Sequence, residues 1–342
     1  MSITLKDIAR KVGVHPSTVS RVLNSKNQSL RIPESTRKRI IQAAKEMNYQ
    51  PNEMARGLRL KKTHTIGLVV PDISNPFFSY IAKSIELEAD KKGYSVIICN
   101  SDENQDKEIN SIELLRKRRC DGIIIAPVQD TSQHFKALKK EKYPFVFVDR
   151  QFEDFEANTV VTDNYRDAYR AVDYLIQLKH RKIGFISGRR GIYTIRGRLA
   201  GYKAALNAYS IPFIEEYRSG EGFSAESGYE ATRQILSLAE RPSALLVSGN
   251  LITIGALQAI HEMKLSIPAD MSVIGFCDSP GVAVYQPPLT TIAHPLSQIG
   301  KEAFSLLVDT IQSKNRDAYK KIVLSTQFVI RNSTAQSLKS SI

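Results

Sequence analysis

Long apolar segments are missing from this sequence, and their absence excludes a membrane-spanning helix. The nearest approach runs from Ala244 to Ile260 and is interrupted by Ser248, Gly249 and Asn250, whereas a span needs about 20 mostly apolar residues. The first residues, MSITLKDIARKVG, mix both charge signs with apolar side chains and contain no hydrophobic region of a secretory signal. We therefore expect a cytoplasmic protein with no membrane partner.

Cysteine is also scarce, and the usual catalytic signatures do not occur. Cys99, Cys120 and Cys277 are widely spaced and form no CxxC pair, which argues against a disulfide framework or a zinc site. The six histidines are scattered, and no GxSxG, HExxH, Walker P-loop or GxGxxG follows an expected strand. We predict neither an enzyme nor a bound metal or cofactor.

Positive charge is abundant but unevenly distributed. The 342 residues include 48 Lys and Arg against 35 Asp and Glu, a net charge of +13. Residues 1–64 hold 14 basic and 4 acidic residues, so most of the excess lies in the first fifth of the chain. A small basic module is typical of nucleic-acid binding, because neutralising phosphates supplies sequence-independent affinity. A solvated basic tail is the alternative.

The basic segment begins with the pattern of a short helix. Its apolar residues recur at helical spacing and are Leu5, Ile8, Ala9 and Val12. Thr4 is the expected N-cap, with Asp7 three residues later in an arrangement close to a capping box. Gly13 is the expected end of this helix.

Two more helices are expected, and the second helix of the three has one polar face. Pro16 suits its first turn, where a missing N–H costs nothing. Its expected buried residues are Val19, Val22 and Leu23, and its outward residues are Ser17, Thr18, Ser20, Arg21 and Asn24. The third helix, from about Pro33 to Met47, is expected to bury Ile40, Ile41, Ala44 and Met47. Together they indicate a helix-turn-helix whose second helix enters a major groove.

The rest of the chain alternates apolar runs rich in Ile and Val with helical segments. This alternation predicts βαβ units and parallel sheets covered on both faces. The expected strands are Ile66–Val70, Ser95–Cys99, Gly122–Ala126, Phe145–Val148, Lys182–Ile186, Ala244–Val247 and Ser272–Phe276. They exceed what one small sheet needs, so the expected fold is an all-α headpiece followed by an α/β core of two doubly wound lobes.

Polar and aromatic residues follow these strands, where doubly wound folds bind their ligands. After the first, fourth, sixth and seventh strands come Asp72, Asn75, Phe77 and Phe78, then Asp149 and Arg150, then Gly249 and Asn250, then Cys277 and Asp278. Aromatic rings that stack on a sugar, with Asp, Asn and Arg that bind hydroxyl pairs, indicate a sugar pocket between the lobes. Phe77 and Phe78 alone fit core packing equally well.

Two segments resemble the DNA-binding headpiece of the LacI/GalR family of bacterial repressors, namely LKDIARKVGVHPSTVSRVLN and RIPESTRKRIIQAAKEMNYQPNEMARGL. The resemblance continues through Arg198, Gly201 and Tyr202, and through PPLTTI and FVIRNST. It implies a core similar to periplasmic sugar-binding proteins and a homodimer that binds a pseudo-palindromic operator in double-stranded DNA. The implied domains are a headpiece at 1–49, a hinge helix or linker at 50–62, and an effector-binding and dimerisation core at 63–342.

The resemblance also assigns residues to DNA binding. Positions that meet base edges are matched by His15, Pro16, Ser17 and Arg21, and other DNA-contact positions by Thr4, Thr18, Ser20, Asn24 and Asn52. Pro51–Leu60 matches the hinge helix, which is too short to persist alone; Leu58 matches the minor-groove wedge and Ala55 the helix-helix contact. His15 and Pro16 depart from the family, which usually has a small hydroxyl residue followed by a residue other than Pro.

Further positions match the effector cleft of the family. They are Asp72, Phe77, Phe78, Asp149, Arg198 and Phe223, with Thr194 matching a contact of the purine-responsive branch. Asp163 and Asn164 match a segment that crosses between the lobes. Arg150, Asn250 and Asp278, from the strand ends, complete the expected effector site.

Two departures concern the charge of this cleft. Gly249 and Asn250 stand where many sugar-responsive members carry Asn-Asp, and Cys277 stands where they carry Asp. Five arginines are close in sequence to the expected site: Arg150, Arg189, Arg190, Arg196 and Arg198. We therefore predict a net positive pocket and an anionic effector such as a sugar acid, uronate or sugar phosphate.

Several alternatives remain open at this point. One is that the effector is a neutral sugar or a purine, and another is that Arg189 and Arg190 face solvent. A third is that a phosphoprotein acts as co-repressor, and a fourth is that the chain is a sugar-binding enzyme outside this family. The predicted function is a repressor of carbohydrate-utilisation genes whose operator affinity is switched by its effector.

Overall fold

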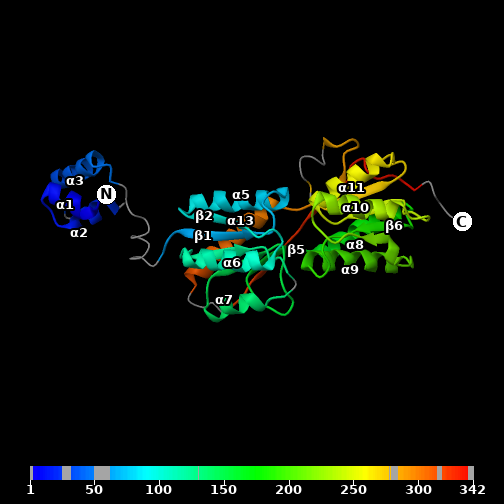
Figure 1. The fold of residues 1–342 in the computed structure, drawn as a ribbon, viewed down its shortest axis with the longest axis horizontal. Helices are drawn as coiled ribbons and strands as arrows, with labels where there is room; N and C mark the ends of the chain where they lie inside the picture. The colour runs from blue at the N-terminus through cyan, green and yellow to red at the C-terminus, as the bar shows by residue number, and fades with distance from the viewer. Residues whose placement is uncertain are drawn as a thin grey trace. The chain divides into compact units, whose positions relative to one another are not determined.

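The computed structural model describes residues 3–24, 32–49, 62–129, 131–276, 278, 284–313 and 318–337. The chain divides into two compact units, Met1–Thr63 and His64–Ile342 (Figure 1). The expected hinge helix, with Asn52, Ala55 and Leu58, lies outside the described residues. None of the helices within the described ranges has the length and hydropathy needed to cross a bilayer.

Three helices form the described part of the first unit: α1 (Leu5–Val12), α2 (Pro16–Asn24) and α3 (Glu34–Glu46). The predicted cap of α1 is confirmed, because Asp7 Oδ2 accepts hydrogen bonds from the backbone N–H (2.9 Å) and the hydroxyl (2.7 Å) of Thr4. Gly13 ends the helix at a φ of 71°, a left-handed conformation that suits glycine.

The core of this unit is built from one stripe of each helix. Its buried members are Ile8, Ala9, Val12, Val19, Val22, Ile40, Ala43 and Ala44. The expectation that Ile41 is buried is wrong, since 38% of it is exposed. Ile40, Ala43 and Ala44 follow the spacing of one helical face, and Ile41 lies about 100° away from that face.

The described part of the second unit contains two six-stranded sheets, one in each lobe. The first lobe has the order β11-β5-β4-β3-β1-β2, with all neighbours parallel. Its strands are β1 (Thr65–Val70), β2 (Ser95–Asn100), β3 (Gly122–Ile125), β4 (Phe145–Val148), β5 (Thr159–Thr162) and β11 (Lys321–Leu324). The second lobe has the order β12-β10-β9-β8-β6-β7, with only β12 antiparallel. Its strands are β6 (Ile183–Ile186), β7 (Arg218–Ser219), β8 (Ala244–Val247), β9 (Ser272–Phe276), β10 (Thr290–Ala293) and β12 (Gln327–Val329).

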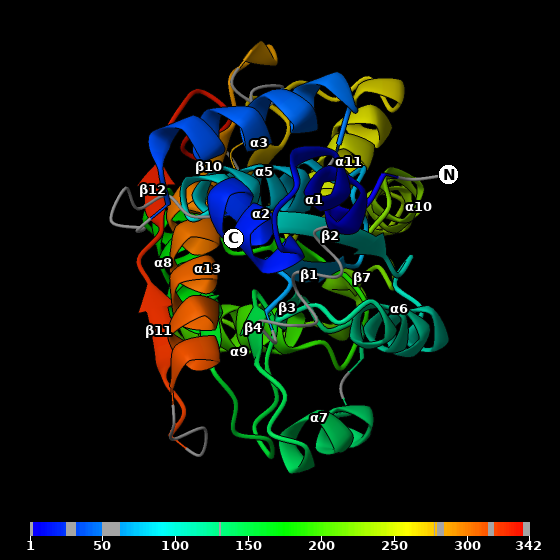
Figure 2. The ribbon, with the colours of Figure 1, turned by 90° about the vertical axis from the view of Figure 1, so that its left-hand side faces the viewer.

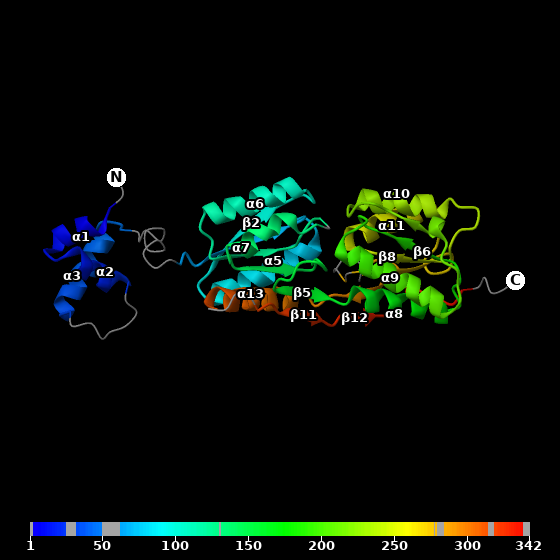
Figure 3. The ribbon, with the colours of Figure 1, turned by 90° about the horizontal axis from the view of Figure 1, so that it is seen from below.

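Helices cover both faces of each sheet (Figure 3). In the first lobe one face is covered by α5 (Pro76–Lys91) and α13 (Leu296–Gln312), and the other by α6 (Gln105–Lys117), η1 (Gln133–Phe135) and α7 (Lys136–Lys140). In the second lobe one face is covered by α8 (Asn164–Gln177) and α9 (Tyr193–Ala208), and the other by α10 (Ala225–Leu236) and α11 (Asn250–Glu262). The short η2 (Glu215–Tyr217) precedes β7. The α/β class, the two lobes and all seven predicted strands are confirmed.

The chain passes between the lobes between β5 and α8, between β10 and α13, and between β11 and β12. Helix α13 therefore returns to the first lobe, where it runs beside β11 in both Figure 2 and Figure 3. The crossing segments contain Asp163 with Asn164, His294 with Pro295, and Ser325 with Thr326. This path brings residues far apart in sequence to the boundary between the lobes.

Candidate functional site

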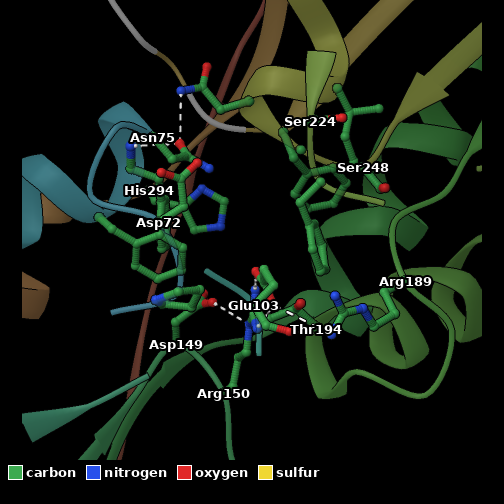
Figure 4. Close-up of a pocket in the computed structure, with 18 of the residues that line it drawn as sticks. Asp72, Asn75, Glu103, Asp149, Arg150, Arg189, Thr194, Ser224, Ser248 and His294 are labelled. Carbon is green, nitrogen blue, oxygen red and sulfur yellow. Dashed lines mark hydrogen bonds and ion pairs between the residues drawn. The ribbon is translucent and has the colours of Figure 1, made fainter. Parts of the chain in front are cut away.

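A cavity of about 430 Å³ lies where the two lobes meet (Figure 4). The predicted effector residues that line it are Asp72, Phe77, Phe78, Asp149, Arg150, Thr194, Arg198, Phe223 and Asn250. Its lining also includes residues that were not predicted: Asp102, Glu103, Ser224, Ser248, Phe276 and His294. Asp102 and Glu103 follow the carboxyl end of β2. From the sequence, this adjacent acidic pair is better interpreted as solvated surface, and that interpretation is wrong for Glu103, whose side chain is 15% exposed. His294 follows β10, a strand that was not predicted.

Asp278 is the predicted effector residue that does not line this cavity. Its carboxylate instead accepts two hydrogen bonds from Arg331 (2.7 and 2.8 Å) and one from Thr291 (2.9 Å). Burial opposes ionisation, but the bonds from Arg331 and Thr291 outweigh it and lower the pKa of Asp278. The carboxylate of Asp278 therefore forms its hydrogen bonds within the second lobe. Cys277 lies outside the described residues.

The start of α5 places aromatic and polar groups at the cavity. Asn75 caps the helix, because its Oδ1 accepts from the N–H of Phe77 (3.1 Å), and Pro76 occupies the first turn. The rings of Phe77 and Phe78 meet edge to face with centroids 5.0 Å apart. Asp72 is oriented by Ser74, whose N–H (2.9 Å) and hydroxyl (2.6 Å) donate to Asp72 Oδ1.

Arg150 lies at one side of the cavity in a bidentate ion pair with Glu103. Its Nη1 and Nη2 donate to the two carboxylate oxygens at 2.9 and 2.7 Å, and Nη1 also donates to the Pro127 carbonyl at 3.0 Å. Burial disfavours the charged guanidinium, but Glu103 and Asp149 outweigh that effect and raise the pKa of Arg150. Burial raises the pKa of Asp149, which Arg150 and Arg198 only partly offset.

Arg198 projects from α9 and is also buried. Its Nε donates to Asn164 Oδ1 at 2.8 Å and its Nη1 to the Ser248 carbonyl at 2.6 Å. The guanidinium carbon lies 4.2 Å from the ring centroid of Phe276. These contacts fix the head group against the wall of the second lobe.

Several polar atoms at the cavity are buried without a protein partner in the described part of the chain. They are Ser248 Oγ, Asn250 Oδ1 and both ring nitrogens of His294. Burial, together with the nearby charge of Arg198, lowers the pKa of His294 to about 3, which the backbone of Ile292 opposes only weakly. The imidazole is therefore neutral near pH 7.

By formal count, the lining of the cavity holds no excess of guanidinium groups over carboxylates. Arg190 pairs with Glu221 (3.2 Å) and Arg196 with Glu153 (3.3 Å), and neither lines the cavity. Three guanidinium groups line the cavity, from Arg150, Arg189 and Arg198, against the carboxylates of Asp72, Glu103 and Asp149. A fourth carboxylate, that of Asp102, is half exposed and forms an ion pair with Lys107. Arg189 does not simply face solvent, because its Nη1 donates to the Glu103 carbonyl at 2.9 Å.

The first unit presents the predicted base-edge residues at the start of α2. His15 precedes the helix, and its Nδ1 lies 2.8 Å from Ser17 Oγ and accepts from the N–H of Ser17 at 3.3 Å. The imidazole thus acts as a side-chain cap for α2. Ser17 and Arg21 are exposed one turn apart, while Val19 and Val22 are buried; the side chain of Asn24 lies outside the described set.

Within the residues that the structure describes, no three His, Cys, Asp or Glu side chains gather in a way that suits a metal ion.

Two family models match the chain. Residues 4–52 match the bacterial regulatory proteins of the lacI family. Residues 172–334 match a periplasmic binding protein-like domain. These ranges correspond to the helical headpiece and to much of the two-lobed core.

Relatives extend over nearly the whole chain. The HTH-type transcriptional repressor PurR of Photorhabdus laumondii is 36% identical, over 92% of each chain. The crystal structure of the lac repressor dimer bound to operator is 29% identical, with a TM-score of 0.86, and covers 98% of this chain and 100% of its own. A LacI family regulator from Enterococcus faecium with bound ribose is 31% identical, with a TM-score of 0.71, and covers 80% of this chain and 99% of its own. The PurR protein and the lac repressor are transcriptional repressors and not enzymes. The chain itself belongs to the lacI family of bacterial regulatory proteins and is a DNA-binding transcriptional regulator.

Proposed function

We propose that this regulator represses carbohydrate-utilisation genes in the cytoplasm and that a neutral monosaccharide in the cavity between its lobes switches its operator affinity. One observation carries the effector class: Ser248, Asn250 and His294, each with a buried side-chain polar atom that has no protein partner in the described part of the chain, line a cavity walled by phenylalanines. Hydroxyl groups satisfy such atoms, and the rings cover the apolar face of a sugar. The relative with bound ribose supports this class.

A sugar acid, which the arginine-rich sequence favoured, is supported less well by the geometry. The two forked donors of Arg150 already hold the Glu103 carboxylate. Asp72, Glu103 and Asp149 line the same cavity, and an ionised carboxylate repels a ligand anion in a poorly solvated space. A neutral ligand avoids both costs.

On the DNA side, the proposed operator contacts are those that the family resemblance assigned. They are Thr4, His15, Pro16, Ser17, Thr18, Ser20, Arg21 and Asn24, with Asn52, Ala55 and Leu58 in the hinge segment. The proposed domains are 1–49, 50–62 and 63–342. The lac repressor dimer on its operator supports a homodimer on a two-fold symmetric site.

The proposed switch works through the lobes. A sugar that binds both walls favours one relative orientation of the lobes, and this orientation alters the spacing of the two hinge segments of a dimer. Because a hinge helix of this length is marginal alone, a coupling of about 1–3 kcal/mol is enough to change operator affinity measurably.

The test uses the full-length protein. Thermal-shift screening against neutral aldoses, aldonic acids, sugar phosphates and purines identifies ligands of the folded state, and selection from random duplexes identifies the operator. We expect stabilisation by a neutral aldose that also changes operator affinity, and an enriched sequence with two-fold symmetry. Stabilisation by acids or purines alone would overturn the neutral-sugar proposal, and an enriched single half-site would overturn the dimer.

A further inference from the structure

Glu103 occupies an unusual position at the edge of the cavity. It follows β2 in the left-handed backbone region, with a φ of 52°, directly after Asp102 at 51°. Side chains other than Asn, Asp and Gly rarely adopt this conformation. The backbone is held there by a hydrogen bond from the N–H of Glu103 to the Pro71 carbonyl (3.2 Å). The result is a carboxylate directed at Arg150, with 15% of the side chain exposed.

We propose that Glu103 determines the ligand specificity of the pocket by occupying the anion-binding edge of Arg150, which excludes sugar acids and sugar phosphates in favour of neutral sugars. The inference rests on the proposed function and deepens it. Figure 4 shows Glu103 between Arg150 and Arg189.

The geometry closes the Nη1 and Nη2 edge of Arg150 to a ligand anion. Its Nε makes no hydrogen bond, but it is buried and lies 3.7 Å from Asp149 Oδ2. The faces of the guanidinium are near aromatic rings, with its carbon 4.8 Å from the Phe223 centroid and 5.8 Å from that of Phe78. Its Nη1 and Nη2 edge holds both oxygens of Glu103. This fork-to-fork pairing is the arrangement by which arginine binds a ligand carboxylate or phosphate. Glu103 therefore acts as an internal substitute for such a ligand.

Arg189 extends the same arrangement from the second lobe. Its Nη1 donates to the backbone carbonyl of Glu103 at 2.9 Å and lies 4.0 Å from Glu103 Oε2. Two guanidinium groups from different lobes thus approach one carboxylate. Without that carboxylate, both would face a space of the size and charge that suit an acidic group.

The experiment removes the carboxylate in two ways. Glu103→Gln keeps the size and some hydrogen bonds of the side chain, whereas Glu103→Gly removes it and suits the left-handed backbone. Asp106→Asn is the matched control, because Asp106 is an exposed carboxylate three residues later that does not line the cavity. Full-length proteins are titrated calorimetrically with D-ribose and D-ribonate, and thermal shifts are measured with inorganic phosphate against chloride of equal ionic strength.

We expect the dissociation constant of ribonate to be at least about tenfold lower for both Glu103 variants than for the wild type or Asp106→Asn, a change of about 1.4 kcal/mol in binding free energy. We also expect phosphate to raise the melting temperature of both Glu103 variants more than that of the wild type or Asp106→Asn. Glu103→Gly removes the bidentate partner of Arg150, so the thermal stability of this variant is expected to fall and to be restored by phosphate. Equal anion binding by wild type and both variants would overturn the inference. If the variants gain anion binding while no neutral aldose binds the wild type, the inference stands and the neutral-sugar proposal fails.

Discussion

Replacement of Arg198 by Met tests whether the cavity is the effector site. Methionine keeps the apolar stem but removes the bonds to Asn164 Oδ1 (2.8 Å) and the Ser248 carbonyl (2.6 Å). Each buried acceptor left without a donor costs about 1–3 kcal/mol, and the lost contact with Phe276 costs about 1 kcal/mol. Removing a buried charge recovers part of this cost, so we expect the free energy of unfolding to fall by about 2–4 kcal/mol.

The effector should be affected as well, because a hydrogen bond from a charged donor contributes about 1.5–3 kcal/mol. We expect affinity for the neutral sugar to fall at least about tenfold, with operator binding in its absence unchanged. The matched control is Arg196→Met, on the same helix but paired at the surface with Glu153, where the loss should stay within about 1 kcal/mol. Urea unfolding measures the free energy of unfolding, titration calorimetry the affinity for the sugar, and fluorescence anisotropy of a labelled operator the affinity for DNA. An Arg198→Met protein as stable and as responsive as Arg196→Met would refute the reasoning.

Three further predictions follow from particular contacts. His15→Asn keeps an acceptor for the N–H of Ser17, so it should retain the thermal stability that His15→Ala loses by about 1 kcal/mol, while both variants bind operator more weakly; wild-type operator affinity in His15→Asn would contradict a base contact. Burial lowers the pKa of His294 from 6.5 in the unfolded chain to about 3 in the folded protein, so below pH 6.5 protons bind the unfolded state preferentially and the free energy of unfolding declines. Between pH 7 and pH 5, urea unfolding should show a decrease of about 2 kcal/mol from this group that is absent in His294→Gln. Identical pH profiles of the two proteins would disprove this prediction. Gly255→Ala places a Cβ 1.8 Å from the Ala225 carbonyl between α10 and α11, so unfolding free energy should fall by about 3 kcal/mol or more; a wild-type urea midpoint would show that the two helices separate easily.

The sequence by itself determined the elements whose signals are local. Thr4 with Asp7, Gly13 and Pro16 mark helix ends through contacts within one turn, and the structure has α1 and α2 at those ends. Continuous apolar runs marked β1, β4, β8 and β9, because a strand covered on both faces must be apolar at every position. The strand-end rule then gathered Phe77, Asp149 and Asn250 correctly into one cavity lining.

Only the tertiary structure decided which distant groups meet. Strands β5, β7, β10, β11 and β12 were missed. Half of the residues of β5 (TVVT) and of β10 (TTIA) are threonine, and β7 and β12 have only two and three residues. The polar and exposed positions of β11 hide its pairing with β5. Counting arginines near the cleft predicted a positive pocket, yet Arg150 is neutralised by Glu103, 47 residues earlier and at the end of a different strand. Pairing between strand ends depends on sheet order, and no local pattern in the chain encodes that order.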